Sequence, residues 1–231
     1  MKKLLFLVVL SVTANFVLNA QKLLPPLELF SKDKPCYLIK SNGERIDFKI
    51  KDLDRKKGLI VNVEGVSTDG KKFELDAKDI VELALAPSSW AQFAGAMGAS
   101  QSVMKASKTD GTQTGRELVL FYQENIGDKK NTMALLQLLN PDFSSKIRIY
   151  HDPFANETQS VSFGGVAVTG GIDKSFFVKF EGKTRKIFKK DYKDDYKTFF
   201  GTCPDLIKKF KSDFAWRDFP DHVYFFENEC K

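Results

Sequence analysis

The chain contains two histidines, and a familiar hydrolytic site would need one of them. A Ser–His–Asp or Cys–His arrangement uses histidine as its base. His151 lies in Tyr150-His-Asp-Pro153, where the Asp-Pro turn favours a strand-end residue over a base. His222 lies at i−8 from Cys230, two helical turns away, which is too far for a shared set of metal ligands.

A glycine-rich segment has part of the spacing of a phosphate-binding loop. Gly165 and Gly170 match its two glycines, but Gly171 stands where lysine is required. Lys174-Ser175 follows Asp173, whose charge would repel a phosphate. We therefore interpret these glycines as turn residues.

Two pairs of acidic residues could serve as general acid and base. Asp52 and Asp54 share a strand face, but they border the basic turn Arg55-Lys-Lys57, which indicates a neutralised surface. Asp194-Asp195 is the second pair. The chain has no GxSxG, HExxH or EF-hand motif. We expect neither an enzyme nor a bound cofactor or metal, and a hydrolase using His151 or His222 remains the least favoured alternative.

A basic and aromatic segment, Lys183 to Lys197, contains seven Lys or Arg residues and three Asp residues. It could bind an anionic polymer, or it could be an amphipathic helix with aromatic rings inward and lysines in solvent. The formal charge of +6 is a mild excess on a mixed surface. We expect no nucleic acid partner, and any anionic partner is expected to be an envelope glycan or lipid headgroup.

Short strands precede these candidates. Asn42-Gly43 separates two apolar runs, which is a strong hairpin signal. Ile46, Phe48 and Ile50 alternate with charged residues, Asp69-Gly70 marks another turn, and 80–85 is a fifth strand. Five strands within 35–86 predict a small SH3-like or Sm-like barrel, or a compact meander.

A less regular stretch follows. Pro87 begins a predicted helical or flexible connector over 87–115, which ends in a polar loop. Strand patterns return at 117–123, 133–139, 147–149 and 160–168, and a hairpin spans 176–188. This second antiparallel β unit makes the predicted fold class mainly β, with a helical tail.

The tail has helical spacing. Tyr192, Tyr196, Phe199 and Phe200 lie on one helix face, and two further helices are expected after Cys203 and near Phe219. If these last helices run antiparallel, Cys203 and Cys230 lie close enough for a disulfide. Alternatively, Cys230 is a buried reduced thiol, which is the state we expect of Cys36.

The N-terminal 20 residues have the pattern of a secretory signal peptide. Lys2 and Lys3 precede an apolar run, and Ala20 is a small residue suited to cleavage before Gln21. No cysteine follows, so no lipid anchor is expected, and no later run is long enough to span a bilayer. We expect a periplasmic or secreted protein, beginning with an extended lead-in over 21–34.

Two stretches, Leu135–Thr158 and Phe177–Leu206, resemble segments of uncharacterised exported proteins of Bacteroidota. The resemblance covers about half the chain and implies an exported location. It implies no activity and no cofactor.

These observations predict five parts: a signal peptide at 1–20, the lead-in at 21–34, a small β-barrel-like domain at 35–86, the connector at 87–115, and a β-rich domain with a helical tail at 116–231. The expected function is non-catalytic binding of a protein partner or an anionic envelope polymer. The main alternative is a small-ligand-binding protein with an apolar pocket between the β unit and the tail.

Overall fold

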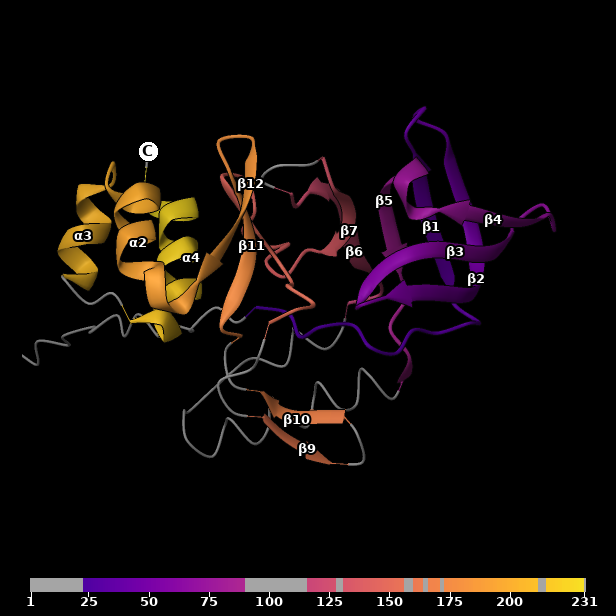
Figure 1. Cartoon of the computed structure of the whole chain (residues 1–231), viewed down its shortest axis with the longest axis horizontal. Helices are drawn as coiled ribbons and strands as arrows, with labels where there is room; N and C mark the ends of the chain where they lie inside the picture. The colour runs from indigo at the N-terminus through magenta and orange to yellow at the C-terminus, as the bar shows by residue number, and fades with distance from the viewer. Residues whose placement is uncertain are drawn as a thin grey trace, which may run out of the picture.

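A computed structural model describes residues 23–89, 116–127, 131–155, 160–163, 166–170, 173–211 and 215–230. The fold is mainly β, as the sequence predicts, with an antiparallel seven-stranded sheet, a three-stranded sheet and C-terminal helices. Figure 1 shows the helices at one end of the molecule and strands β1–β5 at the other, with the three-stranded sheet and β6–β7 between them. The predicted cleavage site, Ala20 and Gln21, lies outside the described residues.

The seven-stranded sheet has the spatial order β4-β3-β2-β1-β5-β6-β7. Its strands are β1 (Pro35–Lys40), β2 (Arg45–Lys56), β3 (Leu59–Ser67), β4 (Lys72–Asp76), β5 (Ile80–Leu85), β6 (Val119–Asn125) and β7 (Met133–Gln137). Strands β1 to β4 form an antiparallel meander, and β5 returns to pair with β1. The five strands predicted within 35–86 are therefore all present.

The local reasons for this sheet are those visible in the sequence. Phe48 and Ile50 are buried while Lys49 between them is exposed, because successive strand residues point to opposite faces. Gly43 (φ 85°) and Gly70 (φ 84°) take up the left-handed conformation that the tight turns between strands require.

The sheet continues past the predicted domain boundary at 115/116. Residues Glu82–Leu85 of β5 pair with Val119–Tyr122 of β6, and β6 pairs with β7. The region 35–86 thus shares one sheet with strands that the sequence analysis assigned to the second domain. Most of the predicted connector lies outside the described residues.

The second sheet has the order β12-β11-β8. Its strands are β8 (Ile147–Tyr150), β11 (Ser175–Phe180) and β12 (Lys183–Phe188), and the separate hairpin pairs β9 (Ser160–Phe163) with β10 (Val166–Gly170). The helices are α2 (Tyr192–Phe200), α3 (Pro204–Phe210) and α4 (Phe219–Glu229). Helices and sheet share an aromatic core that includes Phe176, Tyr192, Phe199, Trp216 and Phe219.

Packed aromatic rings occupy the space between the three-stranded sheet and the helical tail, where the sequence analysis expects an apolar pocket. Phe176 stacks on Trp216 with ring centroids 5.5 Å apart, and Tyr192 meets both Trp216 and Phe219 edge-on. Large rings at this spacing fill the space that a ligand would need.

A buried carboxylate joins the two sheets. Glu124 of β6 accepts hydrogen bonds from the Tyr150 hydroxyl (2.6 Å), the Lys179 ammonium (2.9 Å) and the Thr184 hydroxyl (2.6 Å). The three donors belong to β8, β11 and β12, so one side chain of the first sheet contacts every strand of the second. Apolar side chains including Leu136, Leu138 and Phe177 surround this contact.

The lead-in, residues 23–31, crosses both sheets as an extended segment (Figure 1). Leu23 packs against the helical core, whereas Leu27 is buried in the core of the seven-stranded sheet. The Gln137 side-chain amide binds it twice, accepting from Leu27 N (2.7 Å) and donating to Pro25 O (2.8 Å). An isolated bridge between Phe30 and Pro87 holds its far end.

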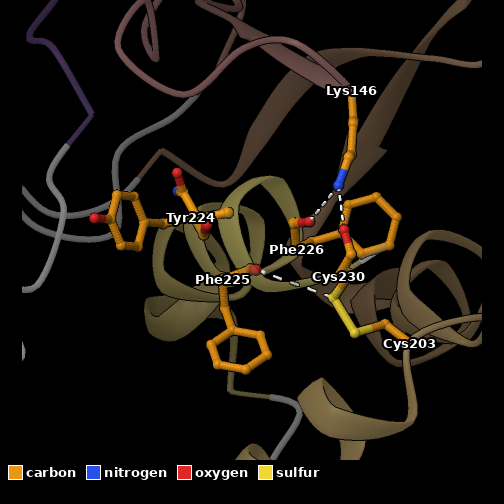
Figure 2. Close-up of a disulfide and its surroundings, with 7 residues drawn as sticks. Lys146, Cys203, Tyr224, Phe225, Phe226 and Cys230 are labelled. Carbon is orange, nitrogen blue, oxygen red and sulfur yellow. Dashed lines mark hydrogen bonds between the residues drawn. A yellow bond between two sulfur atoms is a disulfide. The ribbon is translucent and has the colours of Figure 1, made fainter.

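The helical tail contains the predicted cysteine pair. Cys203 precedes α3 and Cys230 follows α4, and the two are joined in a disulfide with their Cα atoms 5.7 Å apart (Figure 2). Figure 2 also shows the Lys146 ammonium donating to the carbonyls of Phe226 and Cys230 at the end of α4. Cys36 is a free, buried thiol, and burial raises its pKa.

We predict that Glu124→Ala destabilises the protein by about 2–4 kcal/mol, because it leaves the buried Tyr150 hydroxyl and the partly buried Lys179 ammonium and Thr184 hydroxyl without their acceptor. Urea unfolding followed by circular dichroism measures the change. The matched control is Glu64→Ala, which removes an exposed ion pair with Lys51 (2.9 Å) and should cost less than about 1 kcal/mol. Equal losses in the two variants would contradict a joining role for Glu124.

We also predict that peptide mapping without reduction finds a Cys203–Cys230 crosslink and a free Cys36. The double variant Cys203→Ser/Cys230→Ser should lose about 3 kcal/mol of unfolding free energy, because the bridge closes a loop with a sequence separation of 27. A crosslink that contains Cys36, or three free thiols in exported protein, would show that the pairing is wrong.

Candidate functional site

The described residues line an open cavity of about 240 Å³ where the two sheets meet the lead-in. Its apolar lining includes Leu27, Ile60, Phe121 and Leu135. Its polar lining comes from separate parts of the chain: Glu28, Arg55, Gln137, His151, Asp152 and Asp173. This cavity lies at a different place from the pocket expected between the β unit and the helical tail.

The segment 151–155, directly after β8, forms one wall of this cavity. The Asp152 carboxylate is fully buried and accepts hydrogen bonds from the Ser175 hydroxyl (2.6 Å) and from Phe154 N (3.0 Å). It also pairs with the Lys186 ammonium at 2.6 Å. These three contacts fix the turn that begins at the predicted Asp-Pro signal.

Arg55, near the end of β2, is far from this turn in the sequence but lines the same cavity. Its guanidinium donates to Leu27 O at 3.0 Å, which holds the side chain against the lead-in. Burial lowers the pKa of Arg55, and the nearby Glu28 charge opposes that shift. The sequence analysis interpreted Arg55 only as a turn residue, because nothing in its neighbourhood of lysines distinguishes it.

His151 and Asp173 are two cavity residues whose side chains could act as an acid–base pair. His151 Nδ1 lies 3.5 Å from Asp173 Oδ2, longer than an ordinary hydrogen bond. Nδ1 is buried and has no hydrogen-bond partner. The nearby Ser175 hydroxyl donates to Asp152 rather than to His151, so Ser175, His151 and Asp173 do not form a nucleophile–base–acid relay.

His222, one of the two histidines that a hydrolytic site would need, is a core residue. The ring is fully buried, lies parallel to Tyr192 and meets Phe210 edge-on with centroids 4.5 Å apart. Its Nδ1 is 2.7 Å from the Tyr192 hydroxyl, whose pKa burial raises. A substrate cannot reach a base that is enclosed by aromatic rings.

The two acidic pairs lie on β2 and on α2, outside the cavity lining. Asp52 is exposed and accepts a bond from Leu53 N, and Asp54 is exposed beside it on β2. Asp195 pairs with Arg185 at 2.9 Å, and burial raises its pKa, whereas Asp194 is exposed. Neither pair faces the cavity.

The glycine segment gives no phosphate cradle among the described residues. Gly170 ends β10 and Ser175 begins β11, while Gly165 and Gly171 lie outside the described residues. Within the described part of the chain, no group of three or more His, Cys, Asp or Glu side chains could hold a metal ion. The helices described there include none of the length and apolar character needed to cross a membrane.

The basic and aromatic segment forms β12 and α2, so it is only partly the amphipathic helix that was the alternative reading. On its surface, Phe188 (39% exposed) and Phe154 (46% exposed) flank Lys186, whose ammonium is 5.2 and 5.7 Å from the two ring centroids. Lys190 lies 5.7 Å from the Phe188 ring. Other exposed lysines of the segment are Lys183, Lys189, Lys193 and Lys197.

We call Phe154, Phe188, Lys186 and Lys190 the basic–aromatic surface. Sequence reasoning identified its lysines and Phe188 from the charge run but missed Phe154, which is 34 positions earlier and reaches the surface only through the 151–155 turn. No protein-family model, curated protein or solved structure matches the chain.

We predict that Gly58→Ala disturbs the cavity wall. Gly58 has φ 82°, and a Cβ there would lie 2.7 Å from Pro153 Cβ. Gly43→Ala is the matched control, since Gly43 has φ 85° in another hairpin turn with nothing within 4 Å. Both should lose about 1 kcal/mol from backbone strain, and Gly58→Ala about 1–3 kcal/mol more from the clash, measured by urea unfolding. Equal losses of stability in the two variants would contradict close contact between Gly58 and Pro153.

Proposed function

We propose that this is a non-catalytic binding protein that acts outside the cytoplasm and binds an anionic polysaccharide of the cell envelope through the basic–aromatic surface. The observation that carries the proposal is the pair of exposed rings, Phe154 and Phe188, held on either side of a lysine. Exposed apolar groups that lie together mark interaction sites more often than scattered ones do.

The chemistry of the surface fits a sugar polymer with negative charges. An aromatic ring offers a flat apolar face to the C–H groups of a sugar, and lysine ammonium groups attract carboxylate or phosphate substituents. The Lys186 charge is already paired with Asp152, so this lysine serves mainly to position the two rings, which its ammonium contacts. The exposed Lys190 beside Phe188 is left to meet the anionic groups of the ligand.

The proposed location rests on the sequence of residues 1–20 and on the resemblance to exported proteins. The disulfide between Cys203 and Cys230 is compatible with an oxidising compartment, where such bonds persist. The non-catalytic assignment is supported by the separation of the candidate groups: His222 is enclosed in the core, and Ser175 is bonded to Asp152 rather than His151.

The test is titration of the mature protein with polygalacturonate, a carboxylated polysaccharide, and with neutral dextran. We expect saturable binding of polygalacturonate alone, weakened by added salt because screening reduces the lysine contribution. Phe154→Ala/Phe188→Ala should weaken binding about tenfold, equivalent to about 1.4 kcal/mol. Tyr224→Ala, which removes a ring of similar exposure (41%) on α4, is the control and should leave binding unchanged.

Binding of dextran with the same affinity would contradict the role of the lysines. Unchanged binding by the double phenylalanine variant would contradict the role of the rings. Circular dichroism of each variant shows whether it is folded before its affinity is compared.

A further inference from the structure

The cavity beside the 151–155 turn is lined by groups of opposite charge. Arg55, from β2, supplies a positive guanidinium, and Asp173, before β11, supplies a carboxylate that is 14% exposed. Leu27, Ile60 and Phe121 provide an apolar lining beside them. A ligand with one anionic group, one cationic group and an apolar side chain would match all three kinds of wall.

His151 and Asp173 are arranged to receive a hydrogen-bond donor. The 3.5 Å between His151 Nδ1 and Asp173 Oδ2 leaves both atoms near each other without an ordinary hydrogen bond, and Nδ1 is buried without a partner. A buried polar atom without a partner is costly. An ammonium group has three N–H donors, so it could donate to Nδ1 of a neutral histidine and to the Asp173 carboxylate at once.

Arg55 is suited to the other end of such a ligand. Its guanidinium has five N–H donors, and the bond to Leu27 O fixes the side chain with one of them. A planar guanidinium binds a carboxylate through two parallel hydrogen bonds. Glu28 and Arg55 are both exposed and both line the cavity, and the guanidinium donates to Leu27 O rather than to the Glu28 carboxylate.

The volume limits the ligand to a small molecule. A cavity of about 240 Å³ is slightly smaller than the ~300–1,000 Å³ of pockets that take drug-sized ligands, which suits a molecule of amino-acid size.

We propose that this cavity binds a free amino acid with an apolar side chain, its carboxylate on Arg55, its ammonium between His151 and Asp173, and its side chain against Leu27, Ile60 and Phe121. This site is separate from the basic–aromatic surface and does not depend on the polysaccharide proposal. The two sites share only the 151–155 turn, which has His151 on the cavity side and the exposed Phe154 on the surface.

The test compares three probes by isothermal titration calorimetry: L-leucine, 4-methylpentanoate, which lacks the ammonium, and 3-methylbutylamine, which lacks the carboxylate. We expect leucine to bind with a Kd below about 1 mM and each of the other two at least about tenfold more weakly. Either analogue binding as tightly as leucine would overturn the assignment of a zwitterion. No saturable heat with leucine up to about 10 mM would overturn the site itself.

Variants locate the binding. Asp173→Asn and Arg55→Gln should each weaken leucine binding at least about tenfold, because each removes one charged contact. Arg45→Gln is the matched control, since Arg45 pairs with Asp47 on the exposed face of β2 and does not line the cavity. Leucine affinity that is unchanged in both cavity variants, measured on protein shown to be folded by circular dichroism, would place the site elsewhere and overturn the proposal. All three variants should bind polygalacturonate normally, so a failure here is distinct from a failure of the surface.

Discussion

The buried carboxylate of Glu124 is the contact on which the arrangement of the two sheets depends. An unpaired charge in a protein interior is strongly destabilising, so this carboxylate is tolerated only where its donors converge. Those donors, Tyr150, Lys179 and Thr184, lie on three different strands of the second sheet. The four polar groups have fixed directions, and they act together with backbone hydrogen bonds from His151 N to Gln137 O and from Leu139 N to Ile149 O, which join the same two sheets.

The lead-in also connects the two sheets. It has no regular partner strand, so its backbone groups are satisfied one by one: Leu24 N donates to Leu139 O, Ser31 N to Ala86 O, and the Gln137 amide serves both Pro25 and Leu27. Pro25-Pro26 suits this role, because proline favours extended backbone and lacks an N–H that would need an acceptor. With Leu23 in one core and Leu27 in the other, the segment joins the two units and closes the cavity at the same time.

The sequence predicts what depends on neighbours along the chain and misses what depends on neighbours in space. Alternation at Ile46, Phe48 and Ile50 and the tail spacing from Tyr192 to Phe200 identify faces, and those faces are buried as expected. Nothing in β6 indicates that it pairs with β5 across a long connector, because edge pairing leaves no local pattern. The cavity was missed for the same reason: Arg55, His151 and Asp173 come from three distant segments. Glu124 is buried, although its polar neighbours Gln123 and Asn125 would predict an exposed position.

The 151–155 turn links the two candidate sites through Asp152. A fully buried aspartate after a strand costs free energy unless several donors meet it, and here the Ser175 hydroxyl, Phe154 N and the Lys186 ammonium all do so. The Lys186 contact holds a cation among aromatic rings whose outer faces are open to solvent, and the Phe154 N contact fixes the turn that puts Phe154 there. The same turn leaves His151 facing the cavity. One carboxylate therefore shapes an apolar and basic surface outside and a polar wall inside, although it contacts neither proposed ligand.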